Sequence, residues 1–411
     1  MGIKNVFLIT KLKTTNIGNE ALSNEIIKLF SSFTEQINLQ VNGRPDGLDG
    51  YYPRRIANKK KPEFYIEKWS DEIVKKIKKE KKADFKKIIP RVKLLRNNHH
   101  VFKNDEYKAK LRPFKRWLVS FTTYSSQYQE RAIQLNSADW LIYSGAGEVG
   151  DYHVFLRQLV EIRVAQKLGV KTAAINQSVV IKTDMFKKLI GHVYGKMNKI
   201  VIRGETSRQN LIGYGVPEKI IEVAPDSSIN SITSTKRKEG LSNLVAINIT
   251  PKVAISNKEL DMIIQHLQHA GKKIIFVTNE PYEDSGIAKH FFHRYHIDIH
   301  DKFKNYHEYI EKLAECDFVI SARLHTNMLS LVSETPVIPI EGNVFKTREL
   351  LDQLQYPVTT LNSGTAEWVD RLRQEIDHLI SNHYDFKSYF GNVFPIHKKA
   401  AEKNAAWILG C

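Results

Sequence analysis

Cysteine is scarce in this chain, since Cys316 and Cys411 are the only two among 411 residues. Two cysteines cannot form a disulfide framework, and these two lack the paired spacing of a structural zinc site. Long apolar runs are also absent, because no segment reaches the roughly 18 apolar residues of a membrane span. The opening stretch MGIKNVFLIT has neither the basic segment nor the small-residue cleavage site of a secretory signal. We therefore expect a cytoplasmic protein that does not span a membrane.

Acidic residues are scarce in one segment of the chain. Residues 51–120 contain 23 Lys and Arg against 8 Asp and Glu, which gives +15 of the total formal charge of +17. Within it, Ile66, Trp69, Ile73 and Ile77 recur at helical spacings of three and four, with lysines on the other faces. Three interpretations remain open: a solvated helix packed on a domain, a contact with an anionic membrane or glycolipid surface, and a nucleic-acid site.

No zinc-finger, RNP or helix-turn-helix signature accompanies the basic charge, so we expect no nucleic-acid partner. A membrane contact would place the protein peripherally, at the inner face of the membrane.

The rest of the sequence has the pattern of a two-domain α/β protein. Strand-like runs rich in β-branched residues alternate with helical runs, as in parallel sheets covered on both faces. The polar stretch 228–243 interrupts this rhythm and resembles a linker. We predict two facing Rossmann-like domains, at 1–230 and 241–388, with a basic helical insertion at about 43–130 in the first. We expect a last helix within 389–411 that crosses back to the first domain.

Arg323 and His325 lie where a strand-like run, DFVIS, gives way to a helical run. Ligands of open parallel sheets bind beyond the carboxyl ends of the strands, where helix amino termini favour anions. Arginine binds carboxylate or phosphate, and histidine transfers protons near neutral pH. The pair therefore indicates acid–base chemistry on an anionic substrate. The structural alternative is an arginine paired with a carboxylate and a histidine that caps the helix.

Other polar residues fall at equivalent strand ends. The entry NIGNEA contains Gly18, which allows a close backbone approach, and Glu20, which is suited to a sugar hydroxyl. Arg203 and Asp226 each follow a later strand-like run. The loop SGAGEVGDYH has the spacing G-x-G-x-x-G, but no acidic residue ends the following strand, which argues against dinucleotide binding.

A histidine run in HFFHRYHIDIH has helical spacing that a zinc site could use. The second part of this run has the pattern of a strand, which separates the histidines, and no orienting carboxylate is evident. We therefore predict no metal site at His290, His293, His296 and His300.

Taken in order, NIGNEA, LIYSGAGEVGD, VIRGETS, APDSS and VISARLHTNMLSLVSETPVIPI followed by Lys346 resemble the polysaccharide pyruvyl transferase family. The resemblance covers most of the chain except roughly residues 43–130. It implies a glycosyltransferase-B-like pair of domains and a pyruvyl ketal transferred from phosphoenolpyruvate, the donor substrate, to a sugar, with no further cofactor.

The resemblance also implies roles for individual residues. His325 would be the catalytic acid–base residue. Donor binding would fall to Arg203, Arg323, Leu324 and Lys346. A sugar or lipid-linked oligosaccharide acceptor would be bound by Asn16, Asn19, Glu20, Glu148 and Asp151. A two-domain glycosyltransferase using an activated sugar is the alternative enzyme, and a surface-glycan binding protein is the non-enzymatic alternative.

Overall fold

The structure is a computed structural model that describes residues 3–43, 62–80 and 135–410, apart from 13, 34, 136, 146, 147, 152, 234, 236, 238–241 and 343. The first domain is built on a parallel sheet with the order β2-β1-β3-β5-β6-β7, and β4 pairs with β5. Its strands are β1 (Lys4–Thr10), β2 (Ile37–Gly43), β3 (Trp140–Ser144), β4 (Glu148–Gly150), β5 (Lys171–Val180), β6 (Lys199–Ile202) and β7 (Ile221–Val223). Its helices are α1 (Ile17–Ser31), α3 (Pro62–Glu80), α7 (His153–Lys167), α8 (Asp184–Tyr194) and α9 (Glu205–Gly213), with the 3-10 turns η3 (Glu218–Ile220) and η4 (Ser227–Asn230).

The second domain repeats this design with the parallel strand order β10-β9-β8-β11-β12. Its strands are β8 (Leu244–Asn248), β9 (Lys273–Val277), β10 (Asp298–His300), β11 (Phe318–Ser321) and β12 (Val337–Pro339). Its helices are α10 (Asn257–His269), α11 (Pro281–Tyr295), α12 (Tyr306–Ala314), α13 (Leu324–Val332), α14 (Lys346–Gln353) and α15 (Trp368–Ile380). The strands are short and dominated by buried β-branched residues, as parallel pairing between two helical layers requires. The predicted α/β fold class is confirmed.

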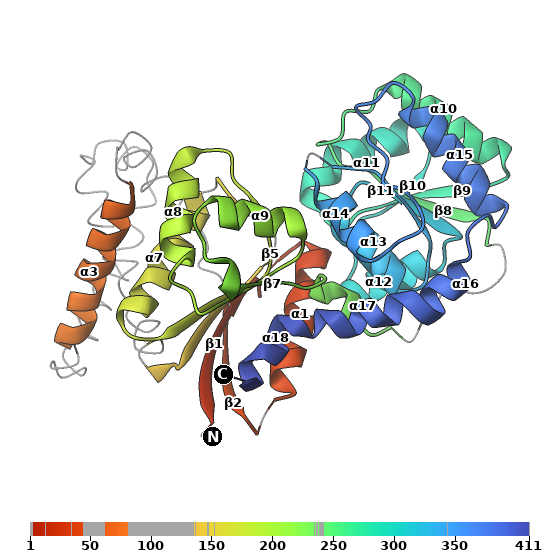
Figure 1. The fold of residues 1–411 in the computed structure, drawn as a ribbon. Helices are drawn as coiled ribbons and strands as arrows, with labels where there is room; N and C mark the ends of the chain where they lie inside the picture. Colours follow the sequence, from red (N-terminus) through yellow and green to blue (C-terminus); the bar gives the residue numbers. More distant parts are fainter. Residues whose placement is uncertain are drawn as a thin grey trace, which may run out of the picture.

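The C-terminal segment passes from the second domain to the first (Figure 1). It consists of α16 (Phe386–Ser388), the π-helical turn η5 (Tyr389–Val393), α17 (Phe394–Ala401), α18 (Lys403–Ala406) and η6 (Trp407–Gly410). Ala401 packs in the core of the second domain, whereas Ala405 and Ile408 pack in the core of the first. Trp407 packs edge-to-face against Trp140 of β3, with ring centroids 5.0 Å apart.

Helix α3 lies in the predicted basic segment and packs against α7 and α8 (Figure 1). Its inner face buries Ile66, Ser70 and Val74. The side chains of the predicted apolar residues Trp69 and Ile73, like that of Ile77, lie outside the described residues, as does most of 43–130. In the part of the chain that the structure describes, none of the helices has the length and apolar character needed to cross a bilayer.

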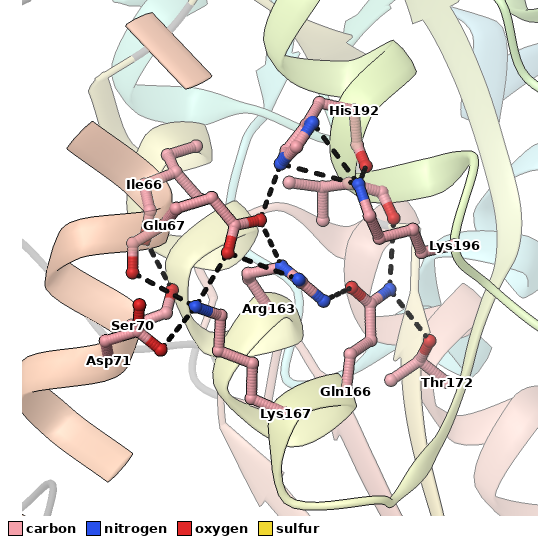
Figure 2. A network of polar contacts seen from close by, with 11 residues as sticks. Ile66, Glu67, Ser70, Asp71, Arg163, Gln166, Lys167, Thr172, His192 and Lys196 are labelled. Atoms are coloured by element: carbon pink, nitrogen blue, oxygen red, sulfur yellow. Dashed lines mark hydrogen bonds and ion pairs between the residues drawn. The ribbon is translucent and has the colours of Figure 1, made fainter. Parts of the chain in front are cut away.

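A carboxylate on α3 ties the helix to the domain (Figure 2). Glu67 accepts a hydrogen bond from Arg163 Nε at 2.6 Å, forms an ion pair with Lys167 Nζ at 2.6 Å, and lies 2.6 Å from His192 Nε2. Asp71 adds a second contact to Lys167 Nζ at 2.5 Å. Three partners from α7 and α8 therefore converge on one acidic side chain and fix the orientation of α3.

Replacing Glu67 with glutamine should lower the free energy of unfolding by about 1–2 kcal/mol near neutral pH, because charge-assisted hydrogen bonds are lost. Burial raises the pKa of Glu67, but Arg163, Lys167 and His192 lower it more, from 4.5 to about 2. A carboxylate whose pKa is lower in the folded state stabilises the fold fully when the pH is above its unfolded-state pKa. This stabilisation is lost as the pH falls towards the folded-state pKa. The difference in the free energy of unfolding between wild type and Glu67→Gln should therefore decrease below about pH 4.5.

Urea unfolding across this pH range measures the effect. Glu218→Gln is the control, because the Glu218 side chain is 63% exposed in its pair with Arg208. A Glu67→Gln deficit that stays constant as the pH falls would contradict this prediction.

Candidate functional site

The amino-terminal end of α1 joins the two domains. Asn16 caps the helix, since its Oδ1 accepts a hydrogen bond from the Asn19 amide at 2.9 Å. The Ile17 amide donates across the boundary to the Asn279 carbonyl at 3.0 Å, and Asn16 Nδ2 donates to the Glu280 carboxylate. Asn16 follows β1 and Asn279 follows β9. The carboxyl ends of both sheets therefore meet at this helix end.

Three ionisable side chains also meet across the boundary. Arg203, directly after β6, donates from Nη1 to Asp226 Oδ2 at 2.6 Å and from Nε to Ser178 Oγ at 3.1 Å. His325, in the first turn of α13, places Nε2 3.7 Å from the same oxygen of Asp226. The exposed fractions of Arg203, Asp226 and His325 are 1%, 0% and 9%. The structure therefore brings Arg203 and His325 together through Asp226.

This group is suited to proton transfer. Burial alone would raise the pKa of the Asp226 carboxyl, but Arg203 and His325 lower it well below its usual range. A fixed carboxylate beside an imidazole orients the ring and stabilises its protonated form. The contacts of Arg203 hold Asp226 in place, while its predicted role in donor binding stays a prediction.

Strand β5 is irregular beside this group. Its register with β6 shifts between Ile175 and Gln177, and Asn176 between them has a left-handed φ of 56°. Bulges of this kind redirect side chains near functional sites. Asn176 Oδ1 accepts a hydrogen bond from the Ser227 amide, next to Asp226, at 3.2 Å. Position 145 must be glycine here, since a Cβ on Gly145 would lie 1.9 Å from the Asn176 carbonyl oxygen.

Buried polar side chains lie on η4 directly after Asp226, on β5, and on α13 two residues after His325. All the members of this polar cluster are at most 1% exposed. Within the described residues, hydrogen-bond partners are missing for Asn176 Nδ2, Gln177 Nε2, Ser227 Oγ, Ser228 Oγ, Asn327 Nδ2 and Asn327 Oδ1. Leaving buried polar atoms unpaired costs free energy, and such atoms call for a functional explanation. This cluster identifies the surroundings of Asp226 as the candidate active site.

Gly18 lies against the imidazole of His325. A Cβ on Gly18 would come within 2.2 Å of the His325 side chain. Gly18→Ala should therefore displace the ring and lower turnover by about 10- to 100-fold, since shifts near 1 Å have effects of this size. Steady-state kinetics measures the loss.

The control for Gly18→Ala is Gly213→Ala in α9, where an added Cβ would meet nothing within 4 Å. Unchanged turnover in Gly18→Ala would show that the position of His325 does not depend on this contact.

The predicted donor residue Arg323 contacts α11. Its Nε donates to Asp284 Oδ2 at 3.3 Å, its Nη2 donates to Asp284 Oδ1, and its Nη1 donates to Glu283 Oε2 at 2.8 Å. Burial alone would lower the pKa of Arg323, but the two carboxylates raise it. Leu324 packs against the core of the second domain, and Lys346 is the first residue of α14. Donor binding by these residues stays a prediction.

The predicted acceptor residues lie at separate places. Glu20 is on α1 beside the second domain, where burial raises its pKa and His307 partly offsets the rise. Asp151 accepts hydrogen bonds from the amide and hydroxyl of Thr183 at 3.1 and 2.6 Å, which fixes the turn before α8. The side chain of Glu148 lies outside the described residues. The contacts of Asp151 favour a structural role, and acceptor binding by this set stays a prediction.

A pocket of about 420 Å³ lies between α9 of the first domain and α14 of the second. Glu349 crosses the boundary and accepts a hydrogen bond from the Thr206 amide in the first turn of α9. A Cβ on Gly204 would lie 2.1 Å from the Glu349 carboxyl carbon. The pocket is lined by Gly204, Glu205, Thr206, Val223, Phe345, Arg348, Glu349, Asp352 and Gln353. Neither Arg323 nor His325 lines it, so it is a separate part of the interdomain boundary.

The histidine run is divided between two elements, but the predicted strand begins later than expected, after His296. His290 and His293 lie on α11, His296 ends that helix with a left-handed φ of 53°, and His300 lies on β10. Over the described ranges, no group of three or more His, Cys, Asp or Glu is placed to hold a metal ion.

Some residues of the site were not assigned by sequence reasoning. Asp226 was recognised at a strand end but received no role, and Asn176, Gln177 and Asn327 received none. The available signal was the run Asn176, Gln177 and Ser178, because consecutive polar residues are unusual inside a buried parallel strand.

A family model described as polysaccharide pyruvyl transferase matches residues 16–343. A comparison with curated proteins finds no match. The matched region contains Arg203, Asp226, Arg323 and His325, and it includes all five strands of the second sheet and every strand of the first except β1.

Solved structures resemble the whole chain. UDP-N-acetylglucosamine 2-epimerase from Rickettsia bellii has a TM-score of 0.53 at 10% identity, covering 100% of this chain and 97% of its own. UDP-GlcNAc 2-epimerase from Methanocaldococcus jannaschii has a TM-score of 0.51 at 12% identity, covering 99% and 100%. Anabaena Alr3699/HepE in complex with UDP has a TM-score of 0.52 at 9% identity, covering 99% and 100%. At such low identities, similarity to a solved structure is evidence for the fold alone. The structural similarity confirms the predicted glycosyltransferase-B-like arrangement.

Proposed function

The chain belongs to the polysaccharide pyruvyl transferase family, and we propose that it takes the pyruvyl group from phosphoenolpyruvate and attaches it to two hydroxyls of one sugar as a cyclic ketal. The observation that carries this proposal is the contact of His325 with the Arg203–Asp226 pair at the domain boundary, 3.7 Å from Asp226 Oδ2 to His325 Nε2. A buried carboxylate that stays ionised suits a histidine that must alternate between its two protonation states.

The reaction needs a proton donor and a proton acceptor. His325 would protonate the methylene carbon of phosphoenolpyruvate, which becomes a methyl group and leaves positive charge on the neighbouring carbon. A sugar hydroxyl would add to that carbon and pass its proton to the neutral imidazole. Inorganic phosphate would then leave with the electrons of its carbon–oxygen bond, and the second hydroxyl would add to the same carbon, pass its proton to the departing phosphate and close the ring. Asp226 would stabilise the imidazolium at the start and end of this sequence.

The donor and acceptor would occupy the boundary between the domains. Arg323 and Lys346 would bind the anionic groups of the donor, with Arg203 holding Asp226 behind them. Leu324 would keep Arg323 and His325 in place by packing on the core. Asn16, Asn19, Glu20 and Glu148 would bind a sugar or lipid-linked oligosaccharide acceptor from the first domain, with Asp151 holding the turn before α8.

The experiment that tests the donor is direct. Purified protein is incubated with phosphoenolpyruvate or with nucleotide sugars, and thermal unfolding shows which donor stabilises the chain. Stabilisation by phosphoenolpyruvate, with phosphate release when a galactoside or mannoside is added, supports the proposal. Activity with a nucleotide sugar and none with phosphoenolpyruvate would assign the chain to the glycosyltransferase alternative.

We further propose a peripheral contact of α3 with anionic lipid at the inner face of the membrane. The inner face of α3 is fixed by Glu67, and its outer face exposes Phe64, Lys68, Lys75 and Lys78 at helical spacing. Lysines near an anionic surface contribute about 1 kcal/mol each and are screened by salt.

Cosedimentation with phosphatidylserine vesicles should therefore fall steeply as salt rises, and replacing the three outer lysines with serine should reduce it. Vesicle binding that does not change with salt concentration or with lipid charge would contradict this prediction. The control replaces three exposed lysines of the second domain, Lys258, Lys289 and Lys302.

A further inference from the structure

Two cations at neighbouring strand ends of the second domain share one carboxylate. Lys252 follows β8, and Arg323 follows β11, which pairs with β8. Glu283, in the first turn of α11, places Oε1 2.6 Å from Lys252 Nζ and Oε2 2.8 Å from Arg323 Nη1. Each oxygen of Glu283 therefore contacts one cation, as the two oxygens of a bound anion would.

The two carboxylates on Arg323 differ in how firmly they are held. Asp284 is fully buried, contacts two nitrogens of the guanidinium, and accepts a hydrogen bond from Thr278 Oγ1 at 2.6 Å. Glu283 is 35% exposed and the partner Lys252 is 49% exposed. Asp284 therefore fixes the plane of the guanidinium, while the Nη1 edge and Lys252 face outward towards a carboxylate that can leave into solvent.

The net charge of this group changes when the Glu283 carboxylate leaves it. With Glu283 in place, the four charges of Lys252, Arg323, Glu283 and Asp284 cancel. With Glu283 rotated away, this group carries one net positive charge. Burial raises the pKa of Glu283, but Lys252 and Arg323 lower it more, so the carboxylate is held in its anionic form.

We propose that Lys252 and the Nη1 edge of Arg323 form an anion subsite for the donor, and that Glu283 occupies it as an internal competitor until a carboxylate or phosphate displaces it. This inference rests on the proposed function, because it concerns the anionic groups of the donor. It adds Lys252 as a donor-binding residue and Glu283 as the group that controls access.

Direct binding of small anions to the full chain tests the inference. Inorganic phosphate, pyruvate and phosphoenolpyruvate are titrated calorimetrically into wild type, Glu283→Gln and Lys252→Gln. Removing the competing charge should tighten anion binding by about tenfold, and removing the lysine should weaken it by about tenfold, as expected for one charge at contact distance. The response to phosphate or to pyruvate shows which end of phosphoenolpyruvate the subsite takes.

Glu222→Gln is the matched control. Glu222 is 34% exposed and also lies between two lysines, 2.7 Å from Lys199 Nζ and 4.0 Å from Lys403 Nζ. It should leave anion affinity unchanged. Glu283→Gln should also lower the melting temperature without anion while increasing the stabilisation by anion, which simple damage to the fold would not do.

The two proposals fail in different ways. Unchanged affinity of Glu283→Gln for all three anions, with phosphoenolpyruvate still bound by wild type, would overturn the subsite and leave the function standing. If wild type binds uridine diphosphate and not phosphoenolpyruvate, the proposed donor is wrong. Uridine diphosphate then becomes the probe, and tighter binding to Glu283→Gln still supports the subsite whereas equal binding overturns it.

Discussion

Replacing His325 with alanine should lower turnover with phosphoenolpyruvate and a galactoside or mannoside by about 10²–10⁴-fold, the usual contribution of a positioned acid or base. Donor binding should remain nearly intact, because the proposed donor cations Arg323 and Lys252 are not altered. The imidazole lies against Gly18 and places Nε2 3.7 Å from Asp226 Oδ2. Steady-state kinetics combined with calorimetric donor titration separates the two effects.

His269→Ala provides the control, because His269 is exposed in the last turn of α10. Its turnover should match that of wild type. A His325→Ala enzyme with wild-type turnover would remove His325 from the mechanism, and one that loses donor binding to the same extent as turnover would make it a binding residue.

Asp226→Asn should reduce both stability and turnover. The Arg203–Asp226 pair is 1% and 0% exposed, and leaving one charge of a buried pair without its partner costs about 3–5 kcal/mol. Turnover should fall by at least about 10²-fold, because the imidazolium loses the carboxylate that orients and stabilises it. The pKa of Asp226 is lowered, so its contribution to stability is present above the unfolded-state pKa and persists until the pH falls far below it.

Two further variants separate stability from catalysis. Asp317→Asn removes the carboxylate of another buried pair, 2.7 Å from Lys272 Nζ, at the opposite end of β11 from His325. It should destabilise the fold and preserve turnover per folded molecule. Combining Arg203→Met with Asp226→Asn removes both charges and should recover stability but not turnover. Full turnover in Asp226→Asn would exclude the carboxylate from the mechanism.

Much of the fold follows from local sequence patterns. Apolar, β-branched runs such as residues 199–202 and 318–321 form strands of parallel sheets, whereas the stretch expected to be a linker begins with Ser228 and Ile229, which are buried in η4. The apolar pattern of a strand depends only on which of its side chains are buried on each face of the sheet, so it can be recognised in the sequence. The irregularity at Asn176 could not be predicted, because it arises from the register with β6 and from the close approach of Gly145.

The sequence indicates some residues of the candidate site but not the side chains that they contact. Position at a strand end singled out Arg203, Arg323 and His325. The partners of Arg323 lie about forty residues earlier in the chain, on α11. Asp226 contacts Arg203 within the first domain and His325 of the second domain. Such pairings depend on how two sheets are placed in space, which strand patterns do not encode.

A double connection links the two domains close to Asp226, the partner of His325. The chain leaves the first domain just after η4 and returns through α17 and α18. The two crossings are joined where Asn404 Nδ2 donates to the Pro225 carbonyl at 2.9 Å, one residue before Asp226. Rotation of the second domain about this point would leave Asp226 nearly in place and carry His325 away from it. The 3.7 Å approach of His325 Nε2 to Asp226 Oδ2 therefore depends on how the two domains are placed relative to each other.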